Sequence, residues 1–309
     1  MSTSTHSNVS ARRIATRTSV NGVELSYEER GSGPPLLLIH GTGAHTELWS
    51  PVLDGLARSF RVIAYDRRGF ARSPSPKRWS LSDHARDAVA LLDSLGASPA
   101  VVVGWSGGGV VALDLAASFP EHVIALVLAE PSVHLLLHPT RSSLAMAVRS
   151  AGNRYLRRDP AKAAATMYRW ASGYRTGGNA FDGLPQAWRQ QMLAHPGSTL
   201  REMDQMMRPY PSRGRIRSIK CPVSVVEGEL SDPTFLVADA FVMRLLPRAN
   251  KISLAGAGHF LHIDQPEQWV EAIVNATRPT TSSLATAGTG ARPRSLTVPG
   301  LGSTSEVSR

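Results

Sequence analysis

The sequence is poor in cysteine and in acidic side chains, and it has no long apolar run. Its one cysteine, Cys221, cannot form a disulfide within the chain. Cys221 precedes Pro222 beside an apolar run and has no basic neighbour in sequence, which favours a small buried residue over a reactive thiol.

The longest apolar runs fall well short of the roughly 18 residues that a membrane-spanning helix needs. The N-terminus also lacks the apolar segment of a secretory signal peptide. We therefore expect a soluble, cytoplasmic protein with no membrane span. The N-terminal composition also fits an organelle transit peptide, so import stays open, as does a homo-oligomeric state.

Both ends of the chain have a composition that disfavours a packed core. Residues 1–19 are rich in Ser, Thr and Arg without an acid, and residues 278–309 are rich in Ser, Thr, Gly and Pro. Such segments bury too little apolar surface to offset chain entropy, so we predict that both are disordered.

Between these ends, short apolar runs alternate with segments of helical periodicity. The runs lack polar alternation, which is typical of strands buried on both faces of a parallel sheet. Segments such as 49–57, 85–95 and 264–274 repeat apolar residues at helical spacing. We predict an α/β fold with a mostly parallel central sheet and helices on both faces. The predicted strands are 35–39, 62–65, 100–103, 124–128, 223–226 and 252–254.

A serine lies at a predicted strand-to-helix turn. Gly104-Trp105-Ser106-Gly107-Gly108 follows the run 100–103 and precedes the helix-like stretch 110–117. A serine between glycines in this context is typical of a nucleophile elbow, which exposes the hydroxyl at the top of a sheet. The backbone N–H of Gly107 would begin a helix, where it can bind an oxyanion.

Two further residues complete a catalytic set. Asp232 follows the run 223–226, and His259 follows the run 252–254. The order Ser, Asp, His is that of α/β-hydrolases and differs from the orders of chymotrypsin and subtilisin.

Four motifs resemble those of the α/β-hydrolase superfamily, in its esterase, lactonase and perhydrolase-like branch. They are 40–43 (His-Gly-Thr-Gly), 66–73 (Asp-Arg-Arg-Gly-Phe-Ala-Arg-Ser), the elbow and 256–260 (Gly-Ala-Gly-His-Phe), and together they cover roughly residues 20–277. One departure is Ala71, where relatives usually have glycine; we expect it to alter a loop and not the chemistry.

The resemblance implies a serine hydrolase that needs no metal or other cofactor. Residues 20–131 and 218–277 would form the α/β-hydrolase core, and the strand-free insertion 132–217 a helical cap that shapes substrate choice. Ser106 would be the nucleophile, His259 the base and Asp232 the acid. The backbone N–H groups of Gly107 and Thr42 would form the oxyanion hole, and the residues beside the substrate pocket would be His40, Gly41, Trp105 and Phe260.

The acid has an alternative. Glu130 ends the predicted strand 124–128 at the place from which haloalkane dehalogenases and one group of lactonases supply theirs. We favour Asp232 because the family most often draws its acid from the later loop.

The resemblance favours cleavage of a small-molecule carboxylic ester or lactone through an acyl-enzyme on Ser106. Cofactor-free perhydrolysis and carbon–carbon bond hydrolysis use the same triad and stay open. Relatives that open epoxides or displace halide use an aspartate nucleophile, which serine at 106 argues against. A ligand-binding receptor on the same fold is an alternative of another class.

The predicted cap is strongly basic. It has fourteen Arg or Lys against four Asp or Glu, while the whole chain has a net charge of +10. The excess would attract anionic substrates or an anionic surface, or it would simply solvate the outer faces of helices. We favour simple solvation. No nucleic-acid motif accompanies the charge, so no nucleic-acid partner is expected.

Overall fold

The computed structural model describes residues 16–278, and the predictions of disorder for 1–15 and 279–309 lie outside the described residues. The same prediction is wrong for residues 16–19. Strand β1 (Thr16–Val20) pairs antiparallel with β2 (Val23–Arg30) through the turn Asn21-Gly22. Both turn residues have positive φ, 47° and 72°, and Asn-Gly is the dipeptide that this hairpin turn prefers.

The sheet has eight strands in the order β1-β2-β4-β3-β5-β6-β7-β8. All six predicted runs form strands, and these six pair in parallel, as predicted. The missed hairpin extends the sheet because β2 pairs antiparallel with β4. The six parallel strands are β3 (Pro35–Ile39), β4 (Arg61–Tyr65), β5 (Ala100–Trp105), β6 (Val123–Ala129), β7 (Val223–Gly228) and β8 (Asn250–Leu254).

Helices cover both faces of the sheet because successive residues of the parallel strands β3 to β7 enter different cores. Leu36 and Leu38 pack in one core and Leu37 and Ile39 in the other. The first core includes α1 (Ser50–Ala57) and α12 (Pro266–Ala276). The second includes α2 (Leu81–Ser94), α3 (Gly107–Ser118) and the C-terminal half of α10 (Pro233–Leu245).

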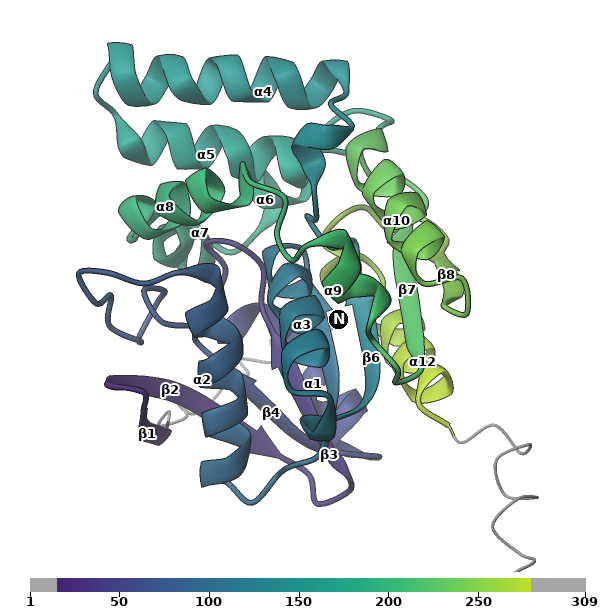
Figure 1. Ribbon diagram of the computed structural model, residues 1–309. Coiled ribbons are helices and arrows are strands. Elements are labelled where there is room, and N and C mark those ends of the chain that lie inside the picture. Colours follow the sequence, from purple (N-terminus) through teal and green to yellow (C-terminus); the bar gives the residue numbers. More distant parts are fainter. Residues whose placement is uncertain (1–15, 279–309) are drawn as a thin grey trace, which may run out of the picture. The chain divides into compact units, whose positions relative to one another are not determined.

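The insertion between β6 and β7 is helical, as the sequence predicts. Figure 1 shows α4 at its outer limit with α5 directly beneath, and α6, α7 and α8 nearer the sheet. A π-helical turn, η4 (Gly152–Leu156), connects α4 and α5. The helices are α4 (Arg141–Ala151), α5 (Pro160–Ala171), α6 (Ala180–Gly183), α7 (Gln186–Leu193), α8 (Pro196–Met206) and α9 (Arg213–Arg217), and α9 packs against α3 and α10.

Candidate active site

Ser106 lies at the sharp turn between β5 and α3. Its φ of 56° and ψ of −122° are a sparsely populated backbone conformation for a residue with a side chain, as expected of a nucleophile elbow. The next residue has to be glycine, because a Cβ at Gly107 would lie 2.2 Å from Oγ1 of Thr42. The turn therefore places the N-terminus of α3, with its free backbone N–H groups, against the loop after β3.

His259, in the loop that follows β8, lies beside this serine. Its Nε2 is 2.9 Å from Oγ of Ser106, and its Nδ1 is 2.6 Å from Oε2 of Glu130. The ring of Phe235 stacks on the imidazole with the centroids 3.7 Å apart, which limits rotation of the imidazole. Because a carboxylate can only accept, Nδ1 carries a proton and Nε2 of the neutral ring is free to accept from Ser106.

The carboxylate at His259 belongs to Glu130, and the expectation that Asp232 holds this position is wrong. Oε1 of Glu130 also accepts from the backbone N–H of Gly228 at 2.7 Å and from the Ser231 hydroxyl at 2.5 Å. These donors fix the carboxylate toward the imidazole.

Asp232 has a different structural task. Its Oδ1 accepts from the backbone N–H of Thr234, which caps the start of α10, and from the hydroxyl of Ser142, each at 2.9 Å. The loop after β7 therefore contributes a hydroxyl, from Ser231, to the site and not a carboxylate.

A buried network that the sequence did not reveal links the cap to the loop after β3. Glu202 of α8 accepts a 2.8 Å hydrogen bond from the Thr42 hydroxyl. Each of its oxygens also accepts from the Arg67 guanidinium at 3.0 Å, and Arg67 donates to the Gly41 carbonyl at 3.0 Å. Glu202 and Arg67 are fully buried, so each charge depends on the other for compensation.

His40 supports this loop from behind. Its Nε2 accepts from the Arg67 backbone N–H at 2.9 Å, so Nδ1 carries the ring proton and donates to the Gly41 carbonyl at 2.8 Å. Burial first, and the nearby Arg67 charge second, lower the pKa of His40 to about 3. His40 is thus a neutral structural part of this loop, as its place in the motif 40–43 implies, but it does not line the pocket beside which the sequence placed it.

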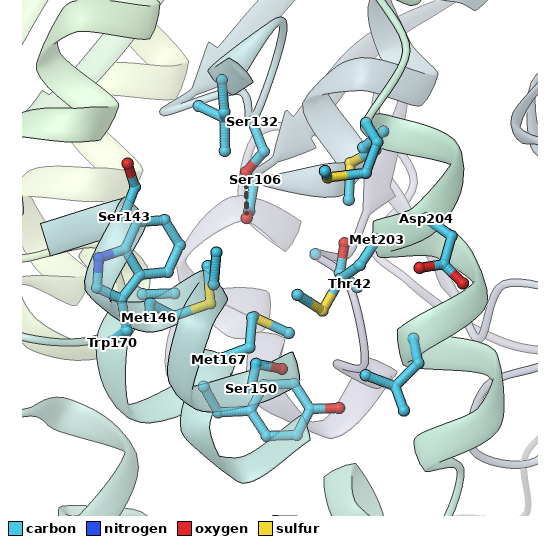
Figure 2. Close-up of a pocket in the computed structure, with 18 of the residues that line it drawn as sticks. Thr42, Ser106, Ser132, Ser143, Met146, Ser150, Met167, Trp170, Met203 and Asp204 are labelled. Carbon is cyan, nitrogen blue, oxygen red and sulfur yellow. Dashed lines mark hydrogen bonds between the residues drawn. The ribbon is translucent and has the colours of Figure 1, made fainter. Parts of the chain in front are cut away.

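A cavity of about 320 Å³ adjoins Ser106 and is lined mainly by apolar side chains; Figure 2 shows part of its wall. Gly41, Thr42, Trp105 and Phe260 contribute to its wall. Six of the eight methionines in the sequence line it, and the unbranched thioether side chain adapts readily to ligand shape. These methionines are Met146, Met167, Met192, Met203, Met206 and Met207.

The polar groups in the cavity are few. The Ser132 hydroxyl lies 3.0 Å from Oγ of Ser106, a contact drawn in Figure 2. Of the lining residues with an ionised side chain, Arg154 and Asp204 pair with each other at 2.8 Å. The cavity therefore offers no unpaired cation to a substrate carboxylate.

Two smaller sequence inferences also have a structural outcome. Cys221 is only partly buried, but burial still raises the pKa of its thiol to about 11, which leaves it protonated and unreactive. Ala71 has a φ of 46°, in the left-handed region, which explains why glycine suits this loop position.

Within residues 16–278, no cluster of three or more His, Cys, Asp or Glu side chains could hold a metal ion. In the same range, none of the helices combines the length and apolar character needed to cross a bilayer.

Known proteins are similar to this chain in sequence and in fold. A model of the alpha/beta hydrolase family matches residues 36–272, and the chain belongs to that family. The sequence is 28% identical to the 2-(acetamidomethylene)succinate hydrolase of Mesorhizobium japonicum over 276 residues, covering 85% of this chain and 94% of that protein. It is 25% identical to 3-oxoadipate enol-lactonase 1 of Acinetobacter baylyi over 256 residues, covering 82% and 93%.

Other matches are shorter or purely structural. A segment of 122 residues, 38% of this chain, is 38% identical to the uncharacterized hydrolase YraK of Bacillus subtilis and spans 45% of that protein. The crystal structure of the enol-lactonase from Burkholderia xenovorans superposes with a TM-score of 0.69 at 19% identity, covering 84% of this chain and 99% of that one. At this identity, the likeness concerns the fold.

Proposed function

We propose that the protein is a serine hydrolase that cleaves small-molecule carboxylic esters or lactones with an apolar acyl part. The observation that carries the proposal is the continuous line of contacts from Ser106 through His259 to Glu130, at 2.9 and 2.6 Å. Relatives named as hydrolases and as an enol-lactonase support the reaction class.

In the proposed mechanism, Nε2 of His259 takes the proton of Ser106 as Oγ attacks the substrate carbonyl. Glu130 holds the imidazole in the required tautomer and stabilises its positive charge. The backbone N–H groups of Gly107 and Thr42 stabilise the oxyanion, at about 3 kcal/mol for each donor. His259 then protonates the leaving oxygen, which leaves the acyl group on Ser106. In the second half, Nε2 of His259 takes a proton from water as its oxygen attacks the acyl carbon, and His259 returns the proton to Oγ of Ser106 as the acid is released.

The cavity supports an apolar substrate over an anionic one. A substrate carboxylate would have to lose its hydration among methionine and aromatic side chains, where the cation in the cavity wall, Arg154, already pairs with Asp204. We therefore expect a preference unlike the dicarboxylate that the name of the Mesorhizobium relative indicates. The basic character of the cap does not extend to this cavity.

The test combines covalent labelling with a series of p-nitrophenyl esters. A fluorophosphonate should add once to the protein, and Ser106→Ala should abolish the adduct and lower the rate by about 10⁴-fold or more. Ser132→Ala is the matched control: its serine lies 3.0 Å away, and the variant should still be labelled. Labelling of the Ser106→Ala protein, or an unlabelled wild type that turns over no ester, would contradict the proposal and would favour a receptor.

The ester series tests the apolar acyl pocket. Each methylene that enters an apolar site gains about 0.8 kcal/mol, so kcat/KM should rise up to fourfold per carbon, at about 1.4 kcal/mol per tenfold, until the cavity is full. An ester of equal length that ends in a carboxylate should be a much poorer substrate. A flat profile, or a preference for the carboxylated ester, would show that the acyl group does not occupy this cavity.

A further inference from the structure

The outer side of the cap carries large apolar side chains that face solvent. Leu156 is 86% exposed, Val148 73%, Tyr155 65% and Leu144 53%. Leu144, Val148 and Tyr155 are spaced by four and seven residues, so they follow one side of α4 and its continuation η4. Single exposed apolar residues are common on soluble proteins, whereas a contiguous row indicates an interaction surface. We call this row, with the adjoining Leu156 and the cations beside it, the α4 face.

Cations without acidic partners flank the row. Residues 141–162 contain six Arg or Lys and a single acid, Asp159. Arg154 pairs with Asp204, whereas the other five form no ion pair within residues 16–278. These five are Arg141, Arg149, Arg157, Arg158 and Lys162.

A groove of about 750 Å³ between α4 with η4 and α5 continues this arrangement. Its wall combines cations with apolar side chains such as Leu156 and Trp170, and no Asp or Glu lines it. The four cations in its wall are Arg149, Arg157, Lys162 and Arg169, of which Arg169 pairs with Asp182 at the surface. Such a groove suits a ligand that has both an anionic and an apolar part.

The α4 face also adjoins the entrance of the active-site cavity. Leu144 and Tyr155 are exposed to solvent and at the same time line the cavity above Ser106, as does the exposed Met207. An apolar acyl chain that entered from this face would pass between apolar side chains without crossing bulk water. The surface and the cavity are therefore continuous.

We propose that the α4 face docks the protein on an anionic lipid surface. The exposed aliphatic side chains enter the boundary between headgroups and acyl chains, and the unpaired cations bind lipid phosphates. Charge complementarity favours this partner over a second copy of the chain: a two-fold contact through the face would place the same cations opposite one another. A nucleic acid fits less well, since aliphatic side chains offer no stacking surface for bases.

This inference goes beyond the proposed hydrolysis and is tested without it. Full-length Ser106→Ala protein is sedimented with vesicles of phosphatidylcholine alone and of phosphatidylcholine with phosphatidylglycerol. We expect binding to the anionic vesicles, weakened by salt, and little binding to the neutral ones. A Ser106 variant keeps the lipid intact, so failure of the catalytic proposal does not affect the result.

Two pairs of double variants assign the binding to the face. Val148→Ser with Leu156→Ser should lower vesicle affinity by about tenfold or more, while Ile124→Ser with Val237→Ser, exposed apolar residues elsewhere, should not. Arg157→Glu with Arg158→Glu should lower the affinity by a similar factor. Arg58→Glu with Arg248→Glu makes the same change in net charge at exposed sites outside the cap and should have a much smaller effect.

Three outcomes would overturn the proposal. The first is equal loss of affinity in the face variants and their controls, and the second is equal binding to neutral and anionic vesicles. The third is a concentration-dependent dimer in light scattering that Val148→Ser with Leu156→Ser abolishes, which would assign the face to self-association. Thermal denaturation checks that all four double variants are folded.

Discussion

Glu130 and Asp232 differ in what their carboxylate oxygens contact. Glu130 reaches His259 and accepts two further hydrogen bonds, one from the last residue of β7 and one from the loop after it, whereas Asp232 caps α10. An aspartate at a helix N-terminus contributes about 1 kcal/mol of stability, and asparagine caps a helix nearly as well. The two carboxylates can therefore be separated by nearly isosteric substitution.

We expect Glu130→Gln to lower kcat by about 10³- to 10⁴-fold, because the amide no longer selects the tautomer or stabilises the charged imidazole. Asp232→Asn should keep kcat within a few-fold and change the melting temperature little. Steady-state kinetics on an activated ester, with thermal denaturation of both variants, measures these effects. A severe Asp232→Asn variant with a mild Glu130→Gln variant would restore Asp232 as the acid.

Among the elements, α8 couples the cap to the loop after β3, which contains Thr42. Glu202 of this helix binds both Arg67 and Thr42, whose backbone N–H is a proposed oxyanion donor. The charge on Glu202 would disfavour a nearby oxyanion if it were not matched by Arg67. We infer that the Arg67–Glu202 pair holds the backbone N–H of Thr42 where it can bind the oxyanion. The position of this N–H then depends on how α8 of the cap packs against the loop.

A matched pair of variants distinguishes this positioning role from simple stability. Glu202→Gln and Asp87→Asn each remove the carboxylate charge from a buried ion pair. Glu202 pairs with Arg67, and Asp87 pairs with the next residue, Arg68. Both should lower stability by several kcal/mol. Only Glu202→Gln should also lower kcat, by about tenfold or more, since it releases an oxyanion donor.

The kinetics are measured well below the melting temperatures of both variants, so that each is fully folded. A large fall in kcat with little change in KM for Glu202→Gln supports the positioning role. Equal kcat values for the two variants would leave Glu202 with a structural role only.

At the scale of helices and strands, the sequence predicts the features that a short stretch of residues specifies, and it does not predict contacts between distant residues. Five of the six parallel strands were predictable because they are apolar on both faces, and the elbow because a short glycine-rich motif specifies it. The sixth, β8, lies at the edge of the sheet and is mostly exposed. The hairpin of β1 and β2 was missed although Asn21-Gly22 signals it, because nine of its thirteen strand residues are polar. The Arg67–Glu202 pair spans 135 positions in sequence, and no local pattern reveals such a contact.

In the whole molecule, the sheet gathers the candidate catalytic side chains at one edge. Ser106, Glu130 and His259 follow the carboxyl ends of β5, β6 and β8, which meet at the same edge of a parallel sheet. The cap covers this edge and carries the basic surface on its far side. Substrate entry and surface binding would therefore take place on the same side of the protein.

Several histidines lie in the interior in their neutral form. Burial lowers the pKa of His40 and His262 to about 3 and that of His45 to about 4, and it lowers the pKa of His84 well below its ordinary value. In the unfolded chain these imidazoles return to a pKa of about 6.5, so at mildly acidic pH unfolding takes up protons. Their contribution to stability is present above that value and is lost as the pH falls from about 6.5 toward 3.

We therefore expect unfolding at a pH near 5.5 to take up protons. The buried imidazoles bind protons once they are exposed, whereas Asp239, whose pKa is raised well above its ordinary value by burial and then by Glu130 and Glu227, releases its proton on unfolding and so reduces the net uptake. His45→Gln should reduce the uptake by about one proton and flatten the acid side of the stability profile, because its amide can still donate to the Trp188 carbonyl that His45 contacts at 3.2 Å. The dependence of the calorimetric unfolding enthalpy on the ionisation enthalpy of the buffer measures the uptake directly. An unchanged proton uptake in His45→Gln would mean that the imidazole of His45 is already protonated in the folded protein. A buried imidazolium would then need a compensating charge that the contacts of His45 do not supply.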